Sequence, residues 1–158
     1  MTRSHEESLT TIRRREETDW PQLLDLWVAS WLATFPRIDF NARRSWLTQH
    51  IAELEKNGAI TLCLTREPNK EIAGFVVINP TTGWLDQICV GPQYFGQGYG
   101  EDLLNIAKKN SPQLILLDVN ADNYRAIRFY ERNDFVQVGE GANTLSGRPT
   151  IMLEWRHS

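Results

Sequence analysis

A glycine-rich segment near the middle of the chain restricts the fold more than any other feature. Residues 90–100 read Val-Gly-Pro-Gln-Tyr-Phe-Gly-Gln-Gly-Tyr-Gly, between a run of β-forming residues and a helix-like run that begins at Glu101. Because glycine has no Cβ, the main chain at Gly96, Gly98 and Gly100 can approach a bulky ligand with its N–H groups exposed. The pattern predicts a strand, a turn that holds phosphate, and a helix, in that order.

Taken alone, these glycines leave three alternatives open. One is a strand-to-helix loop whose glycines only relieve steric strain. A dinucleotide-binding turn needs Gly-x-Gly-x-x-Gly directly after the strand and an acidic residue about 20 positions later. Asp118 nearly supplies the acid, but the glycine spacing differs, and residues 91–95 separate the strand from the first glycine. A methyltransferase-like loop fits the spacing better, but it also requires the glycines at once after the strand and needs more sheet than remains.

Length and composition indicate one globular domain over residues 1–158. A chain of 158 residues can bury about 70% of its unfolded surface. The net charge of −3 and the 41% of hydrophobic residues argue against a nucleic-acid-binding surface and against disorder. The chain has no apolar run of about 18 residues and no hydrophobic signal core near its start. We therefore expect a cytoplasmic protein without a membrane partner, with residues 1–8 as a frayed extension.

The cysteines and histidines do not have the spacing of a metal site. Cys63 and Cys89 lie inside apolar, strand-like runs and are expected to be buried thiols in a reducing compartment. His5, His50 and His157 are scattered along the chain. The sequence predicts no metal.

Hydrophobic periodicity predicts an α+β fold, with an α/β mixed sheet and helices on both faces. A continuous apolar run at 114–119 predicts a strand that is buried on both faces. The unit of strand, glycine loop, helix and strand should be parallel, and the other strand pairs should be hairpin-like. The expected helices begin near residues 19, 41, 101 and 123, and the expected strands are 9–13, 59–64, 72–78, 84–90, 114–119, 135–138 and 151–155.

A second motif follows the apolar run, and the two motifs together resemble those of a known family. Residues 93–98, Gln-Tyr-Phe-Gly-Gln-Gly, resemble the Gln/Arg-x-x-Gly-x-Gly/Ala signature of the GNAT superfamily of acyl-CoA N-acyltransferases. The downstream Asn-x-x-Ala-x-x-Phe-Tyr-x-x-x-Gly-Phe signature of this superfamily resembles the positions Asn123, Ala126, Phe129, Tyr130 and Phe135. The resemblance covers residues 9–155, with the sharp motifs at 84–135.

One position departs from the pattern. Asp134 stands where the family usually has glycine, at the turn between a helix and a strand. Aspartate tolerates left-handed backbone geometry better than most residues. We therefore expect a local adjustment and not a different fold.

The resemblance implies a mostly antiparallel, seven-stranded sheet whose strands splay at a cofactor cleft. Acetyl-CoA, as a co-substrate, would lie between the strand that ends at Val90 and the strand that ends at Val119. Its pantetheine arm would pair with the main chain of Ile88 and Val90 and with Asn123. Its pyrophosphate would bind the positive end of the following helix and the main-chain N–H groups of Phe95, Gly96, Gln97, Gly98 and Gly100. The implied cofactor-binding residues are Ile88, Cys89, Val90, Gln93, Tyr94, Phe95, Gly96, Gln97, Gly98, Tyr99, Gly100, Asn123, Ala126, Phe129 and Tyr130.

Two residues are the candidates for proton transfer. The resemblance implies that Tyr130 protonates the leaving thiolate, although a buried tyrosine that satisfies a main-chain group is the alternative. Asp86 could receive the proton of the amine or attract a cationic substrate, and strand alternation would place it on the same face as Ile88 and Val90. Gln87, Glu140 and Glu154 are weaker alternatives.

The acceptor site in this family is built from the first two helices and the last hairpin loop. The implied substrate-contacting residues are Trp31, Phe35, Trp84 and Asp86. The implied activity is acetyl transfer to a primary amine of a small molecule. A protein N-terminus or lysine as acceptor, and a non-catalytic acyl-CoA-binding module, remain alternatives. The sequence leaves open a homodimer through the last strands.

Overall fold

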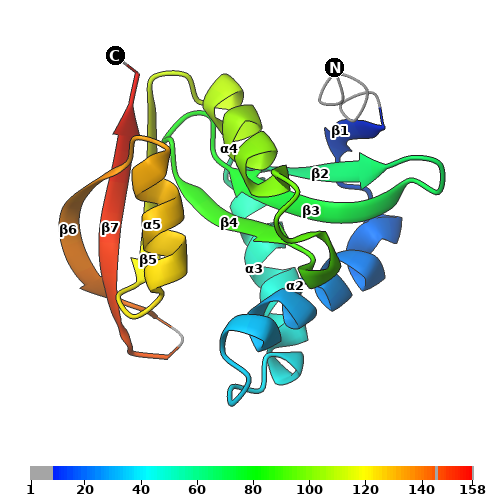
Figure 1. The fold of residues 1–158 in the computed structure, drawn as a ribbon, viewed down its shortest axis with the longest axis horizontal. Coiled ribbons are helices and arrows are strands. Elements are labelled where there is room, and N and C mark those ends of the chain that lie inside the picture. The colour runs from blue at the N-terminus through cyan, green and yellow to red at the C-terminus, as the bar shows by residue number, and fades with distance from the viewer. Residues whose placement is uncertain (1–8, 145, 158) are drawn as a thin grey trace.

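The computed structural model describes residues 9–144 and 146–157, and its ribbon is shown in Figure 1. The extension predicted for residues 1–8 lies outside the described residues. Among the described residues, seven strands form two sheets with the orders β1-β2-β3-β4 and β5-β7-β6. The expected mixed α+β architecture, mostly antiparallel with helices on both faces, is confirmed.

The elements follow the predicted order closely. The strands are β1 (Thr10–Arg14), β2 (Ile60–Arg66), β3 (Glu71–Ile78), β4 (Leu85–Val90), β5 (Leu114–Asn120), β6 (Val136–Ala142) and β7 (Pro149–Arg156). The helices are α2 (Trp20–Thr34), α3 (Arg44–Lys56), α4 (Tyr99–Asn110) and α5 (Tyr124–Arg132), with short 3₁₀ turns η1 (Glu17–Asp19), η2 (Asn41–Arg43) and η3 (Pro92–Tyr94).

The four-stranded sheet is covered on both faces. Strand β3 is buried along nearly its whole length because it is a central strand with apolar residues at consecutive positions. Val76 and Ile78 pack in the cluster that includes α4, whereas Phe75 and Val77 pack in the cluster beneath α2 and α3. The sheet therefore separates two apolar cores.

The three-stranded sheet is covered on one face. Ile115, Leu117 and Val119 of β5 are buried in the cluster that contains Tyr130, whereas Asp118 is exposed. The prediction that β5 is buried on both faces was wrong. Among the described residues, the cluster beneath α2 and α3 has no member from this sheet, so of the four helices only α4 and α5 supply apolar cover.

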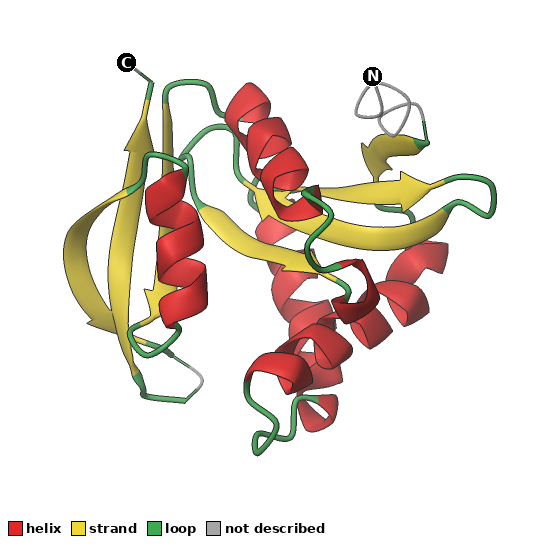
Figure 2. Ribbon diagram, viewed as in Figure 1, coloured by secondary structure: helices red, strands yellow, loops and turns green. Residues whose placement is uncertain are grey.

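The two sheets meet at one point and then diverge. A single parallel bridge links Trp84 to Leu116, whose N–H donates to the carbonyl of Gly83 at 2.9 Å. Beyond this bridge β4 and β5 form no ladder with each other, and Figure 2 shows the resulting separation of the two groups of strands. The splay opens toward the ends of β4 and β5, from which the chain continues to α4 and α5.

Helices α2 and α3 lie on the face of the first sheet opposite α4. Leu23, Trp27, Leu47 and Ile51 are buried against it. Among the residues that the structure describes, no helix combines the length and the apolar character that a membrane crossing requires.

Candidate active site

The glycine loop presents free main-chain donors. Gly96 and Gly98 have φ values of +80° and +83°, a left-handed conformation that glycine adopts without steric cost, and Gly98 is the N-cap of α4. Within the described residues, the N–H groups of Gly96, Gln97 and Gly98 have no hydrogen-bond acceptor. A Cβ at Gly96 would meet no atom within 4 Å, so open space lies beside the loop. These features fit a phosphate group.

The cradle begins one residue later than expected. The N–H of Phe95 donates to the carbonyl of Pro92 at 3.2 Å within η3. This group is therefore already paired, and the free donors start at Gly96.

Strand β4 directs alternate main-chain groups into the gap between the sheets. The N–H of Gly91 donates to Ala73 of β3 at 2.8 Å. Because successive residues of a strand turn their main-chain groups to opposite sides, Val90 and Ile88 direct theirs away from β3, toward the gap. An added strand-like ligand could pair there.

Cys89 faces away from this gap. Its thiol lies 4.0 Å from the carbonyl oxygen of Leu26 in α2, and burial raises its pKa to about 12. The side chain of Cys63 is also buried, as predicted for both cysteines. By the same alternation the main-chain N–H and carbonyl of Cys89 turn toward β3, so neither its thiol nor its main-chain polar groups face the gap.

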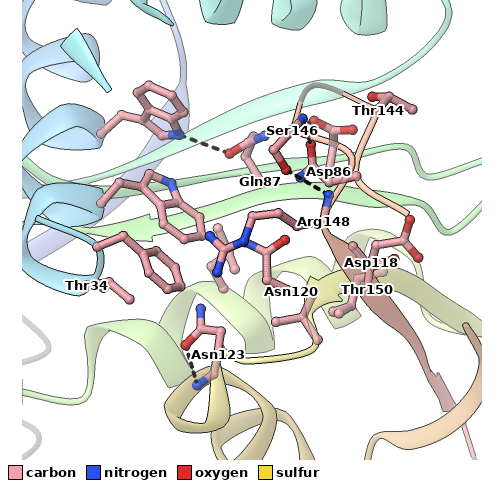
Figure 3. Close-up of a pocket in the computed structure, with 18 of the residues that line it drawn as sticks. Thr34, Asp86, Gln87, Asp118, Asn120, Asn123, Thr144, Ser146, Arg148 and Thr150 are labelled. Carbon is pink, nitrogen blue, oxygen red and sulfur yellow. Dashed lines mark hydrogen bonds between the residues drawn. The ribbon is translucent and has the colours of Figure 1, made fainter. Parts of the chain in front are cut away.

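A cavity of about 410 Å³ occupies the splay and extends to α2 and α3. Its walls come from α2, η2, α3, β4, β5, α5 and the loop between β6 and β7, and Figure 3 shows part of this lining. Of the predicted site residues, those that line the cavity are Trp31, Phe35, Trp84, Asp86, Ile88, Asn123, Ala126 and Tyr130. Val90, Phe129 and the segment 93–100 do not line it.

A β-bulge sets the direction of Asp86. Val77 pairs with Gln87 and Ile78 with Leu85, so Asp86 is the extra residue in β4. The alternation that would place Asp86 on the face of Ile88 is interrupted, and that prediction was wrong. The carboxylate turns toward α3.

Three donors surround the Asp86 carboxylate, which is 13% exposed. Oδ2 lies 2.7 Å from His50 Nε2 and accepts from Gln87 Nε2 at 3.2 Å, and Oδ1 accepts from Trp84 Nε1 at 3.1 Å. Burial by itself raises the pKa of the carboxyl, but the hydrogen bond and charge of the His50 ring and the two other donors outweigh burial and lower the pKa. Asp86 is therefore an anion near neutral pH.

His50 was not predicted as a site residue. It lies on α3 between the buried residues Leu47 and Ile51, stacks on Trp46 with ring centroids 4.6 Å apart, and lines the cavity. The hydrogen bond to Asp86 raises the pKa of the imidazole against the opposing effect of burial. In the sequence, the position of His50 on the apolar face of the predicted helix could have indicated a buried role. Its partner Asp86 could not be identified from sequence spacing.

Tyr130, on α5, forms part of another wall of the cavity. Its ring packs against Phe129 and Phe135, with centroids 5.3 and 5.5 Å away. Among the described residues its hydroxyl has no hydrogen-bond partner, and burial raises its pKa, so the group is protonated at neutral pH. The alternative in which the hydroxyl satisfies a main-chain group is not what the structure shows.

Asn123 has a structural role as well as a place in the cavity wall. Its Oδ1 accepts from the N–H of Ala126 at 3.3 Å and caps α5, as Figure 3 shows. The amide nitrogen of Asn123 donates to no acceptor within residues 9–144 and 146–157.

An aromatic wall closes the end of the cavity near α2. Trp31 stacks on Phe35 and Phe40, with centroids 5.9 and 5.6 Å away. The guanidinium of Arg148, from the loop between β6 and β7, lies 5.0 Å from the Phe35 ring, and that of Arg43 lies 5.3 Å from Phe40. This wall can hold an apolar body, and of the two guanidinium groups at its rim that of Arg148 is paired with Asp122.

The other acidic alternatives lie away from the cavity. Glu154 pairs with Arg156 at 2.7 Å, and neither Glu154 nor Glu140 lines the cavity. Asp118 of β5 does line it, and burial followed by the negative charge of Asp86 raises the pKa of Asp118. In the described part of the chain, no group of three or more His, Cys, Asp or Glu side chains is placed to hold a metal ion.

Comparisons with known proteins give the family of this arrangement. A model of the acetyltransferase (GNAT) family matches residues 20–135. No match was found among curated protein sequences. Because the identities to the following solved structures are 22% or lower, they show a shared fold.

The solution structure of apo-form YjaB from Escherichia coli has a TM-score of 0.74 and 22% identity, over 95% of this chain and 99% of that one. The PaiA N-acetyltransferase from Thermoplasma acidophilum in complex with coenzyme A has a TM-score of 0.72 and 19% identity, over 94% and 99%. The ribosomal-protein-S18-alanine N-acetyltransferase from Escherichia coli has a TM-score of 0.70 and 22% identity, over 95% of each chain.

Proposed function

Since this chain belongs to the acetyltransferase (GNAT) family, we propose that it transfers the acetyl group of acetyl-CoA to a primary amine of a small molecule. The observation that carries the proposal is the cavity at the splay of β4 and β5, which has Tyr130 in one wall and the Asp86 network in another. The family match supports acetyl transfer, and the coenzyme A complex of the PaiA structure supports the donor.

The donor would use groups that the fold leaves free. The N–H groups of residues 96–98 and the dipole of α4 suit the pyrophosphate. The main chain of Ile88 and Val90 suits the amides of the pantetheine arm, and Asn123 offers its amide nitrogen. This assignment brings the thioester to the part of the cavity beside Tyr130.

Tyr130 would assist departure of the thiolate. Direct transfer needs a neutral amine, an acceptor for its proton and a proton donor for the sulfur. The Tyr130 hydroxyl is protonated and free of protein partners among the described residues, so it can donate to the developing thiolate.

Asp86 would attract the substrate and not deprotonate it. Its carboxylate accepts three hydrogen bonds and has a lowered pKa, which makes it a weak base. A buried anion at this point of the cavity favours entry of an ammonium group.

The shape of the acceptor end favours a small molecule. Trp31 and Phe35 form an apolar wall, and Arg148 extends over Phe35 from the opposite loop. A protein terminus is the second candidate, because the fold is shared with an enzyme that is named for acetylating the alanine of a ribosomal protein.

A panel of acceptors tests the proposal. The purified chain and acetyl-CoA are incubated with small aromatic and aliphatic amines, with a peptide that has a free N-terminus, and with a lysine peptide, and thiol release and product mass are measured. We expect turnover with at least one small amine and less with either peptide. Preferred turnover of a peptide selects the protein substrate. Absence of turnover, with thermal stabilisation by acetyl-CoA, selects the binding module.

A further inference from the structure

The hydrogen bond between Asp86 and His50 determines which ring nitrogen of His50 carries hydrogen. Asp86 Oδ2 lies 2.7 Å from His50 Nε2, and the carboxylate, which has no proton to give, can only accept. Nε2 of His50 therefore carries hydrogen. In the neutral ring the lone pair is on Nδ1, for which no partner exists among the described residues.

The position of the imidazole is fixed from several directions. Trp46 stacks on it at an interplanar angle of 12°. Trp27 Nε1 donates to Gln87 Oε1 at 3.2 Å, which turns the amide nitrogen of Gln87 toward Asp86. Asp86 is thus positioned by Gln87, whose own amide is oriented by Trp27 of α2. The Asp86 carboxylate in turn positions the His50 ring.

His50 also has access to the reaction space and to solvent. Its side chain is 30% exposed, and it lines the same cavity as Tyr130. Asp86, in contrast, is 13% exposed and engaged with three donors. Of these two residues, His50 has the larger exposed fraction and a ring nitrogen that has no partner among the described residues.

We propose that His50, held through Nε2 by the carboxylate of Asp86, accepts at Nδ1 the proton that the substrate amine loses during acetyl transfer. The inference rests on the proposed function and names the base for it. Asp86 is then a positioning residue that sets the tautomer and stabilises the imidazolium.

The step begins with the neutral amine, after an ammonium substrate has lost its first proton to solvent, and it conserves atoms and charge. The nitrogen lone pair forms a bond to the thioester carbon, the carbonyl π pair moves to oxygen, and one N–H proton passes to His50 Nδ1. When the C=O bond re-forms, the C–S bond breaks with its electron pair on sulfur, which takes the proton of the Tyr130 hydroxyl. Imidazolium then loses a proton to solvent and the tyrosinate regains one, so an amide and a thiol leave the site.

Other charges around the cavity shape the pH dependence of this base. Asp86 faces His50 from β4, and Asp118 lies on β5. Arg43 of η2 places positive charge at the aromatic wall, whereas Arg148 of the β6–β7 loop is paired with the carboxylate of Asp122. Arg44, beside η2, is paired with Asp25 of α2 at 2.8 Å. The hydrogen bond with Asp86 has the largest effect on His50, so the pKa of the imidazole lies above the ordinary histidine value of about 6.5.

The pH profile of kcat/KM tests the proposal with wild type, His50→Gln, Asp86→Asn and His157→Gln as a surface control. In wild type and His157→Gln, kcat/KM should rise with pH through a single limb above about pH 6.5. The position of this limb should not change when the acceptor amine is changed. His50→Gln should lose this limb and fall about 100-fold or more at pH 7, with KM for acetyl-CoA unchanged. Asp86→Asn should move the limb to lower pH, because the group that raises the His50 pKa has been removed.

The outcomes separate this inference from the proposed function. Wild-type turnover with an unchanged limb in His50→Gln overturns the role of His50 and leaves acetyl transfer standing. A wild-type chain that acetylates no amine overturns both. If His50→Gln does not fold, as judged by circular dichroism, an Asp86→Asn limb that coincides with that of the wild type overturns the inference.

Discussion

Two tyrosines on α5 show how environment separates a functional group from a surface group. Tyr130 is 7% exposed, faces the cavity, and has a raised pKa, whereas Tyr124 is 65% exposed six positions earlier on the same helix. The Tyr130 hydroxyl meets no protein acceptor among the described residues, so it is free to donate a hydrogen bond to a ligand in the cavity.

Replacement of Tyr130 tests its role as the proton donor. Tyr130→Phe keeps the ring that packs on Phe129 and Phe135, so stability and KM for acetyl-CoA should stay close to wild type. The rate kcat should fall about 100-fold, within the usual range for loss of a general acid. Tyr124→Phe is the matched control and should leave kcat unchanged. Equal kcat values for the two variants would show that Tyr130 is not the acid.

Asp134 shows how a departure from a family motif is accommodated by one residue. Its φ is +73°, the left-handed conformation that the glycine of the motif would adopt. Phe135 follows and is buried, so β6 still begins next to the core. The expectation of a local adjustment is confirmed.

At the scale of the element, the loop before α4 depends on left-handed backbone at Gly98. An alanine there would be strained at φ +83° and would turn the N–H groups of the cradle away from their present directions. Gly98→Ala should lower the free energy of unfolding by about 1 kcal/mol and raise the Kd for coenzyme A about tenfold, as measured by urea titration and calorimetry.

Gly139→Ala is the control for this loop variant. It lies in β6, where an added Cβ would make an ordinary 3.7 Å contact with Met152 and φ is not positive. Both stability and affinity should change little, by less than about 0.5 kcal/mol. A Gly98→Ala chain that binds coenzyme A like wild type would exclude the loop as the pyrophosphate site.

The junction between β1 and α2 depends on an ion pair at Asp19. The carboxylate, 10% exposed, accepts from Arg13 at 2.7 and 2.9 Å and from the N–H of Glu16 at 2.7 Å. The hydrogen bond from Arg13 lowers the pKa of Asp19 against the effect of burial. A carboxyl whose pKa is lower in the folded state adds stability above the unfolded pKa of about 4 and loses it as the pH falls.

Asp19→Asn should therefore destabilise the fold in a pH-dependent way. We expect a loss of about 1–2 kcal/mol at pH 7 in urea unfolding, which shrinks below about pH 4 as the wild-type carboxyl is protonated. Asp25→Asn on α2 removes a largely exposed pair with Arg44 and should cost about 0.5 kcal/mol or less. A pH-independent difference between wild type and Asp19→Asn would contradict this account.

At the scale of the whole molecule, two sheets share one parallel bridge and enclose a cavity of about 410 Å³. A donor bound between β4 and β5 would contact both halves and stabilise the native state by mass action. At 100 times its Kd, coenzyme A should add about 2.7 kcal/mol, or a rise in Tm of about 5–10 °C. S-adenosylmethionine is the control ligand. A rise with S-adenosylmethionine and none with coenzyme A would contradict the assignment of the loop.

The arrangement of elements was predictable because its signals are local. Glycines, hydrophobic periodicity and turn residues act over a few positions, and the predicted strands and helices agree with the observed ones within a few residues at most ends. Strand β5 is the exception in burial. Its apolar run is continuous, but whether a second layer covers its other face depends on helices from elsewhere in the chain.

By itself the sequence determined the glycine loop that is proposed to hold the donor. The strand, the glycine loop and helix α4 are consecutive, so local backbone chemistry is sufficient to produce free N–H groups beside open space. Only the tertiary structure decided the part of the cavity that is proposed to hold the acceptor. A bulge against β3 turns Asp86 out of the strand alternation, and α3 packs His50 against it across 36 positions of sequence. Neither strand register nor helix docking can be read from periodicity, since both depend on how separate elements pack.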